Sequence, residues 1–474
     1  MDRNIGLRPV SLHPRRSRET EEMTDRSPMD LTGFNPFNPS VQQCPHLYYR
    51  AMQEQTPVFR VEGTDLYMVT RHESITPILR DTQTFSSRFG SAGAMPTGEV
   101  VDRLRAIVAK GWPQVPTMLT IDPPQQTRYR GTVASFFTPR RMAELRTPVT
   151  EIVNRLIDAL PADGVCDFVK TFAEPLPIEA IAHVLNVPSD RMADFKRWSD
   201  DSIANIGSVI TAERQLEAAE GIVEFQHYFA AQIEQRRAQG EPSEGTSRDL
   251  ISELVHARIE TEPDSNAADT DADPDADPDA DGVHRRHLTV AESLSILQQL
   301  LVAGNETTTK ALTEGMMLLA QHPDEWARLQ ADPAGRAPAV TEEVLRLSTP
   351  TQGMFRLVTA DTKIDGVPIP AGARIIVVYA AANRDPSVWG QDADSFNPDR
   401  ANMKDHLAFG KGVHFCLGAP LSRVEMQVAF ELLATRLRGV SLPDTNDFVY
   451  HPSFVLRGLK KLDVHVHTSQ AAPG

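Results

Sequence analysis

The sequence predicts a mainly α-helical protein with a small β region, and three observations lead to that fold class. Apolar residues recur at helical spacing over residues 149–160, where six of them share one face. A second helical pattern runs over residues 288–322, which is long for a globular protein. Runs typical of strands, such as residues 66–70, are short and few. We therefore expect short strands beside a larger helical body.

The elements follow one another in a clear order. A strand is expected at 66–70, and helices are expected at 149–160, 178–185, 250–259, 288–322 and 334–348. The turn-rich segment 363–372 lies between short strands, one of which is expected at 374–379. The last helix is expected to begin near Cys416 and to continue through Leu433.

Two segments are expected to lie outside the packed domain. Residues 1–30 are polar and contain no apolar run of signal-peptide or membrane-span length, so we expect a disordered tail and no membrane anchor. Residues 264–281 hold eight Asp and no basic residue. Like charges and Pro oppose packing, so we expect residues 262–283 to be a disordered loop. A calcium-binding repeat is the alternative, although Pro and Ala stand where such loops need Gly.

Charge and cysteine content exclude several classes of protein. The formal net charge of −16 argues against a nucleic-acid partner and against an anionic membrane surface. The chain has three cysteines, Cys44, Cys166 and Cys416. A secreted disulfide framework usually has more cysteines and an even number of them. We therefore expect a reducing compartment. Each cysteine taken alone is more often a small buried hydrophobe than a ligand.

The strongest chemical signal is the segment FGKGVHFCLG at residues 409–418. A glycine-rich loop leads into a helix with Cys416 near its start, and a helix N-terminus favours thiolate over thiol. Glycines also let a backbone approach a flat ligand closely. A buried thiol in a loop-to-helix turn is the simpler alternative. A zinc site is a weaker one, because His414 and Cys416 supply only two ligands.

This decapeptide resembles the haem-binding loop of the cytochromes P-450, in which Phe, two Gly, a basic residue, Cys and Gly hold the same places. The resemblance implies a cytochrome P-450 fold with a single haem domain over residues 31–474. It also implies haem b as the cofactor and Cys416 as the metal ligand, whose thiolate favours O–O cleavage. The other loop residues expected to contact the haem are Phe409, Gly410, Gly412, His414 and Gly418.

A second motif, AGNETT at residues 303–308, lies within the long helical pattern. Small residues let a flat cofactor lie against a helix, and a neighbouring carboxylate and hydroxyl can relay protons. An ordinary helix in which Gly304 allows close packing is the alternative. The segment is similar to the oxygen-binding stretch of the same family. On that resemblance Glu306 and Thr307 are the catalytic acid–alcohol pair, and Ala303 and Gly304 contact the haem.

Two further sets of charged residues follow the family's pattern. Glu343 and Arg346 share a helix face and resemble the Glu-x-x-Arg signature, with Arg400 as third partner, which implies a structural role. A surface ion pair is the alternative. The resemblance also implies that Arg130, Arg356, His414 and Gln126 meet the haem propionates. Family members commonly have Glu-His where this chain has Gln125-Gln126, so one of these contacts carries no charge.

The four motifs span residues 122–418 in the family's order, and together they imply a monooxygenase. We expect O2 and a small apolar organic substrate, with electrons from a ferredoxin and a ferredoxin reductase, because the residues after Cys416 are too few for a fused reductase. A cytoplasmic monomer of bacterial type is expected. A peroxide-driven oxygenase and a non-catalytic haem sensor are the alternatives, and Glu306-Thr307 argues against both. The segments expected to face substrate are 85–118, 194–210, 300–304, 350–355 and the region of Phe454.

Overall fold

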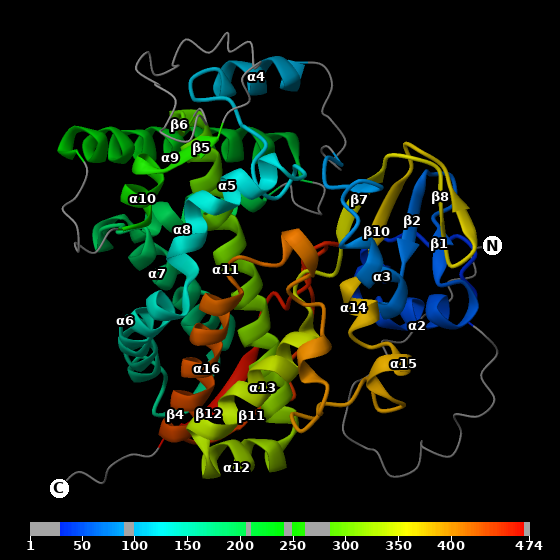
Figure 1. Ribbon diagram of the computed structural model, residues 1–474. Coiled ribbons are helices and arrows are strands. Elements are labelled where there is room, and N and C mark those ends of the chain that lie inside the picture. The colour runs from blue at the N-terminus through cyan, green and yellow to red at the C-terminus, as the bar shows by residue number, and fades with distance from the viewer. Residues whose placement is uncertain (1–28, 90–98, 205–209, 241–248, 261–284, 469–474) are drawn as a thin grey trace, which may run out of the picture.

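A single long helix, α11 (Val290–Gln321), runs through the middle of the protein (Figure 1). Its start is held by a reciprocal cap, in which Thr289 accepts from the backbone N–H of Glu292 and the Glu292 carboxylate accepts from that of Thr289. Arg286 and Tyr129 also bond to Glu292. The helix predicted over 288–322 is thus confirmed, and most of its length is buried by neighbouring helices.

The computed structural model describes residues 29–89, 99–204, 210–240, 249–260 and 285–468. The expected acidic loop at 262–283 and nearly all of the expected tail at 1–30 lie outside the described residues. Among the described residues, no helix has both the length and the apolar character needed to span a membrane.

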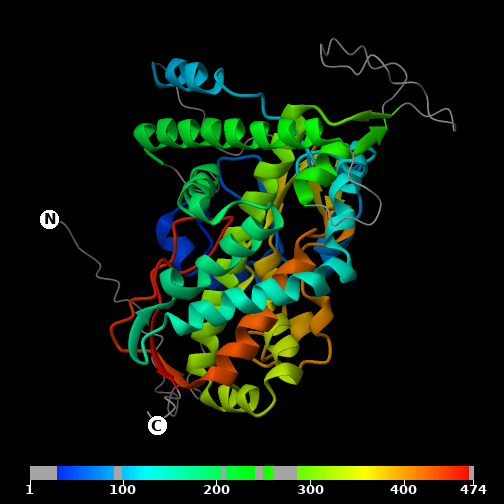
Figure 2. The same ribbon diagram turned by 90° about the vertical axis from the view of Figure 1, so that its left-hand side faces the viewer.

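Helices dominate the body around α11. In chain order the others are α1 (Pro39–Gln43), α2 (His46–Gln55), α3 (His72–Ile78), α4 (Glu99–Val108), α5 (Gln125–Ala134), α6 (Pro139–Asp158), α7 (Pro175–Val184), α8 (Met192–Ile203), α9 (Ala212–Gln239), α10 (Leu250–His256), α12 (Pro323–Ala331), α13 (Pro333–Ser348), α14 (Tyr379–Ala382), α15 (Pro386–Trp389) and α16 (Ala419–Arg436). Figure 2 shows α9 crossing one end of α11. The helices expected at 149–160, 178–185 and 334–348 are confirmed as parts of α6, α7 and α13.

The strands form small sheets at the edges of the helical body (Figure 1). The largest has the order β1-β2-β10-β7-β3, and a second has the order β11-β12-β4. Two hairpins, β5-β6 and β8-β9, complete the set. The strands are β1 (Val58–Arg60), β2 (Leu66–Val69), β3 (Phe85–Ser86), β4 (Asp163–Asp167), β5 (Arg258–Glu260), β6 (Arg285–His287), β7 (Met354–Val358), β8 (Thr362–Ile364), β9 (Val367–Ile369), β10 (Arg374–Val377), β11 (Leu437–Ser441) and β12 (Asp463–Thr468).

Two sequence-based boundaries were wrong. The helix expected over 250–259 ends at His256, because the next residues leave the helix and pair as β5 with β6. The last helix begins at Ala419 rather than near Cys416, with Pro420 in its first turn. Both errors arise because tertiary pairing and loop geometry override a local apolar pattern.

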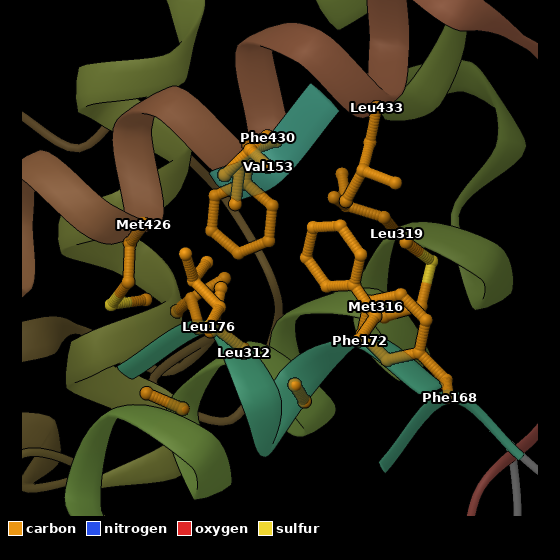
Figure 3. Packing of buried hydrophobic residues seen from close by; sticks show 14 of the residues in the cluster. Val153, Phe168, Phe172, Leu176, Leu312, Met316, Leu319, Met426, Phe430 and Leu433 are labelled. Atoms are coloured by element: carbon orange, nitrogen blue, oxygen red, sulfur yellow. The ribbon is translucent and has the colours of Figure 1, made fainter. Parts of the chain in front are cut away.

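The main apolar core lies where α6, α11 and α16 meet the segment between β4 and α7 (Figure 3). Phe168 and Phe172 stack with ring centroids 5.0 Å apart, and Phe430 of α16 points into the same cluster. Gly315 of α11 makes this packing possible, since a Cβ there would lie 2.5 Å from Phe430 Cζ. The core therefore fixes the position of α16, and with it the start of the helix that follows Cys416.

A buried polar network ties α13 to the segment that precedes the Cys416 loop. Arg346 is fully buried and donates two hydrogen bonds to the Glu343 carboxylate, at 2.6 and 2.7 Å. It also donates to the carbonyls of Asn383, Ala393 and Ser395. Glu343 accepts in addition from the guanidinium of Arg400. The Glu343-Arg346-Arg400 contact expected from the sequence is thus present, and it is not a surface pair.

Replacing Arg346 by Met is expected to destabilise the fold by about 3–5 kcal/mol, because it leaves the buried Glu343 carboxylate without its main partner. Arg328→Met is the matched control, since Arg328 forms only surface ion pairs with Glu325 and Asp399. Urea unfolding followed by circular dichroism measures both. Equal losses of stability in the two variants would contradict the structural role of Arg346.

A second prediction concerns Glu425 of α16, which is buried beside Thr308 of α11. Burial raises its pKa from 4.5 to about 8. Between these values the folded protein holds a proton that the unfolded chain has lost, so the free energy of unfolding falls as pH rises, by at most about 1.4 kcal/mol per pH unit.

Unfolding at pH 6 and pH 8 tests this dependence. Glu425→Gln is expected to flatten the fall in stability between these two pH values, because the amide cannot ionise. Glu431→Gln, which changes a half-buried glutamate on the same helix, is expected to keep it. A wild-type slope retained in Glu425→Gln would show that another group causes it.

Candidate functional site

The loop at residues 409–418 folds back on itself ahead of α16. The Cys416 N–H donates to the Phe409 carbonyl at 2.9 Å, and a short 3-10 turn covers Gly412–His414. Gly410 and Gly412 have φ values of +65° and +73°, which favour glycine. A Cβ at Gly412 would lie only 2.3 Å from the Leu79 carbonyl oxygen. The loop can therefore lie against the end of α3 only because that position lacks a side chain.

Cys416 lies just before α16, and its sulfur is surrounded by groups that stabilise a negative charge. The backbone N–H groups of Gly418 and Ala419 bond to it, and Arg130 and Arg423 lie nearby; all four lower its pKa. Burial acts in the opposite direction and prevails, so the pKa of the Cys416 thiol is raised. The helix start does favour thiolate, as expected, because the N–H groups of Gly418 and Ala419 lower the pKa, but burial outweighs their effect. A bound metal cation would lower the pKa of the Cys416 thiol, because a thiol that coordinates a metal is deprotonated.

Three nitrogen-bearing side chains gather near this loop. Arg356 is 3% exposed, and among the described residues its guanidinium bonds only to neutral groups, the Phe355 carbonyl and the Tyr379 hydroxyl. Arg130, on α5, lies close enough to interact with Cys416 and has no ion pair with a described residue. Both arginines also act on His414. Since buried charges are normally paired, these cations indicate a missing anionic partner.

His414 differs from what its motif position suggests. Burial and the nearby Arg356 lower its pKa to about 4, so the imidazole is neutral at pH 7. Its Nε2 lies 2.9 Å from the Ser87 hydroxyl oxygen. From its motif position His414 was expected to be a cation. In this structure His414 contributes a hydrogen-bonding ring and no charge.

Gln126 braces the loop from α5. It is 1% exposed, and its side-chain N–H donates to the Val413 carbonyl at 2.9 Å. Its side-chain oxygen accepts from the Thr127 hydroxyl. The side chain is thus already engaged on both sides, so the structure assigns it to holding the Cys416 loop and does not show it facing a propionate.

The middle of α11 presents an open face. Ala303 is exposed although it lies well inside a 32-residue helix, and Thr307, one turn later, donates back to its carbonyl at 3.0 Å. Gly304 faces elsewhere, because a Cβ there would lie 3.6 Å from Ile181 of α7. Ala303 and Thr307 therefore share the open side, whereas Gly304 serves helix packing, the alternative that the sequence left open.

Glu306 does not contact the Thr307 hydroxyl in this structure. Its carboxylate pairs with the ammonium group of Lys310, which is 7% exposed. Space for the lysine stem comes from Gly458, where a Cβ would lie 2.2 Å from Lys310 Cγ. Glu306 also acts on Asp200 of α8 and raises its pKa, although burial is the larger cause of that shift. The carboxylate therefore lies at the inner end of a charged cluster.

That cluster leads outward from α11. Lys196 bridges Asp200 and Glu174, with Nζ at 2.5 and 2.7 Å from their carboxylate oxygens. These three side chains are each about one-third to two-fifths exposed. Asp200, whose pKa responds to the charge of Glu306, is thus joined to side chains that reach solvent.

Several residues of the site could not be singled out from the sequence. Lys310 carried a usable signal, because a Glu and a Lys four apart on a helix pair readily. Ser87, Tyr379 and Arg423 carried none, since each reaches the site only through tertiary contacts. Arg423 lies over the Phe409 ring at 4.6 Å and bonds to Glu342, whose pKa falls to about 2.

Aromatic residues from three of the expected substrate-facing segments meet beside the large sheet. Phe355 lies 5.9 Å from Phe89 and 5.8 Å from Phe454, measured between ring centroids. The residues present fit haem b on three counts: a thiol with N–H donors around it, a buried and a half-buried arginine without an anionic partner among the described residues, and a glycine loop closed against α3.

Comparison with known proteins agrees with this geometry. The sequence model for Cytochrome P-450 matches residues 337–456. The monooxygenase PikC of Streptomyces venezuelae is 32% identical, over 94% of this chain and 97% of its own length. Mycinamicin IV hydroxylase/epoxidase of Micromonospora griseorubida is 35% identical, over 88% of this chain and 94% of its own.

Solved structures give the same result. Cytochrome P-450 CYP109Q5 from Chondromyces apiculatus aligns with a TM-score of 0.74 and 31% identity, over 92% of this chain and 99% of its own. The haem domain of a Tepidiphilus thermophilus enzyme aligns with a TM-score of 0.78 and 28% identity, over 91% and 96%. This chain therefore belongs to the cytochrome P-450 family, with its fold and its haem b cofactor, and is a monooxygenase.

Proposed function

We propose that this monooxygenase uses O2 to insert one oxygen atom into a small apolar organic substrate, with electrons from a ferredoxin and a ferredoxin reductase. The observation that carries the proposal is the pairing of two features. Cys416 lies in a loop that only glycines can form, and α11 presents Ala303 and Thr307 on an open face.

In this proposal Cys416 Sγ would bind the haem iron. Arg130 and Arg356 pair with the propionates, and His414 adds a hydrogen bond, which accounts for two cations without a described anionic partner. Phe409, Gly410, Gly412, Gly418 and Ala303 would line the surfaces around the ring, whereas Gly304 packs against Ile181 of α7. When bound, the haem supplies the redox chemistry of oxygen activation.

The protein's own groups tune the sulfur. N–H donors from Gly418 and Ala419 withdraw charge from it, and the nearby Arg130 and Arg423 favour its ionised form.

Thr307 and Glu306 move protons in the proposed mechanism. Thr307 Oγ1 donates to the Ala303 carbonyl and can turn its hydroxyl toward the open face to donate a proton there. Glu306 takes protons from the outer cluster of Lys196, Asp200 and Glu174, and Lys310 keeps its carboxylate at the inner end of that cluster. A peroxide-driven oxygenase has no need of this route, so the O2-dependent reading is favoured.

The aromatic contacts of Phe89, Phe355 and Phe454 support the proposal of an apolar substrate. Relatives carry names as different as 6-deoxyerythronolide B hydroxylase and steroid C26-monooxygenase. The proposal therefore stops at an apolar molecule. We also propose a cytoplasmic enzyme, consistent with its three free cysteines, whereas its expected monomeric state stays a prediction.

The first test is the absorbance difference spectrum of the dithionite-reduced protein with and without carbon monoxide. The wild type and Cys44→Ser are expected to give the strongly red-shifted Soret band of a cysteinate-ligated haem, because Cys44 lies outside the site. Cys416→Ser is expected to lose it. A normal band in Cys416→Ser would overturn the assignment of the ligand.

Thr307→Ala is expected to uncouple NAD(P)H consumption from product and to raise peroxide release, because the variant lacks the proton-donating hydroxyl. Product and peroxide per NAD(P)H oxidised are measured with a ferredoxin and its reductase. Thr309→Ala is the control, since two residues further along the helix the side chain faces away. Equal coupling in the two variants would remove Thr307 from the mechanism.

A further inference from the structure

The sheet β11-β12-β4 carries an unusual group of side chains on its outer face, below α16 in Figure 1. Side chains alternate along β12, so Val464 and Val466 are fully buried while His465 and His467 point outward. On the neighbouring antiparallel strand β4, Asp163 is the direct partner of His467. Strand pairing therefore brings together two imidazoles and a carboxylate that lie about 300 residues apart in the sequence.

The three groups converge on one point. His465 Nε2 lies 3.3 Å from Asp163 Oδ1, and His467 Nδ1 lies 2.9 Å from the same oxygen. The two imidazole centroids are 4.3 Å apart, and the potential ligand atoms all lie within 4.8 Å of one another. Among the described residues, no other trio of His, Cys, Asp or Glu meets this condition.

We propose that Asp163, His465 and His467 bind a divalent transition-metal ion, with Zn²⁺ as the best match. Two imidazoles and one carboxylate form a ligand set that suits Zn²⁺, and water completes the tetrahedron on the solvent side. Ca²⁺ and Mg²⁺ need more oxygen ligands than the single Asp163 carboxylate supplies. Binding consumes no electrons; the protons on the facing imidazole nitrogens move to the other ring nitrogen or to solvent.

The ion would cross-link two strands. It joins the last described strand to β4, which leads directly into the Phe168 and Phe172 part of the core. Metal binding to the folded state alone raises the unfolding midpoint through mass action. This inference concerns a surface remote in the fold from the Cys416 loop and does not depend on the proposed oxygenase chemistry.

Isothermal titration of the haem-loaded protein with ZnCl2 tests the site. We expect one equivalent to bind with micromolar or tighter affinity, and Asp163→Asn, His465→Ala and His467→Ala each to weaken binding about tenfold or more. His227→Ala is the matched control, because this exposed histidine on α9 bonds to the Lys110 carbonyl and packs on Trp112, and it belongs to no such trio among the described residues. It is expected to leave binding unchanged, and CaCl2 in place of ZnCl2 is expected to give no heat.

Thermal unfolding gives the second measurement. Zn²⁺ is expected to raise the midpoint of the wild type and of His227→Ala but not of the three ligand variants, whose midpoints without metal also report whether they fold. No binding at micromolar Zn²⁺ overturns the proposal. Binding that survives in His465→Ala and His467→Ala, or equal binding of Ca²⁺, does so as well, since either would show that the imidazoles are not ligands.

Discussion

The Arg346 guanidinium, buried against the Glu343 carboxylate, is the interaction on which the catalytic end of the protein depends. It bonds to the backbone carbonyl of Asn383, and the Asn383 side chain in turn accepts the N–H of Leu407. The Leu407 carbonyl accepts the N–H of Gly410, the first glycine of the Cys416 loop. One ion pair on α13 thus determines, through three successive hydrogen bonds, where that loop begins.

The neighbouring carboxylate holds the other side of the same loop. Glu342 bonds to Arg423 of α16 and to His406, and Arg423 lies over the ring of Phe409. Two consecutive acidic residues of α13 therefore hold the loop in place. Glu343 acts at the start of the loop, and Glu342 acts through the helix that follows it. The position of Cys416 is then set by one fully buried ion pair, Glu343-Arg346, and one partly buried pair, Glu342-Arg423.

The fold class and most helices could be predicted from the sequence, because helical periodicity is local. The Cys416 loop and the Glu343-Arg346 contact could also be predicted, because a short sequence motif indicates each of them. The features that could not be predicted depend on side-chain direction and on burial. The orientation of Gly304 toward Ile181, the use of Gln126 as a brace and the raised pKa of Cys416 each follow from how elements pack. Strand β5 was missed because its partner β6 comes from beyond the acidic insert.

The largest sheet has a consequence for synthesis on the ribosome. Strands β2 and β3 lie early in the chain but pair with β10 and β7, some 300 residues later by number, and β2 runs parallel to β10. Such distant pairings form slowly. Strands β2 and β3 therefore emerge from the ribosome before these partners, and the Cys416 loop can close against the end of α3 only after every strand of this sheet has been synthesised.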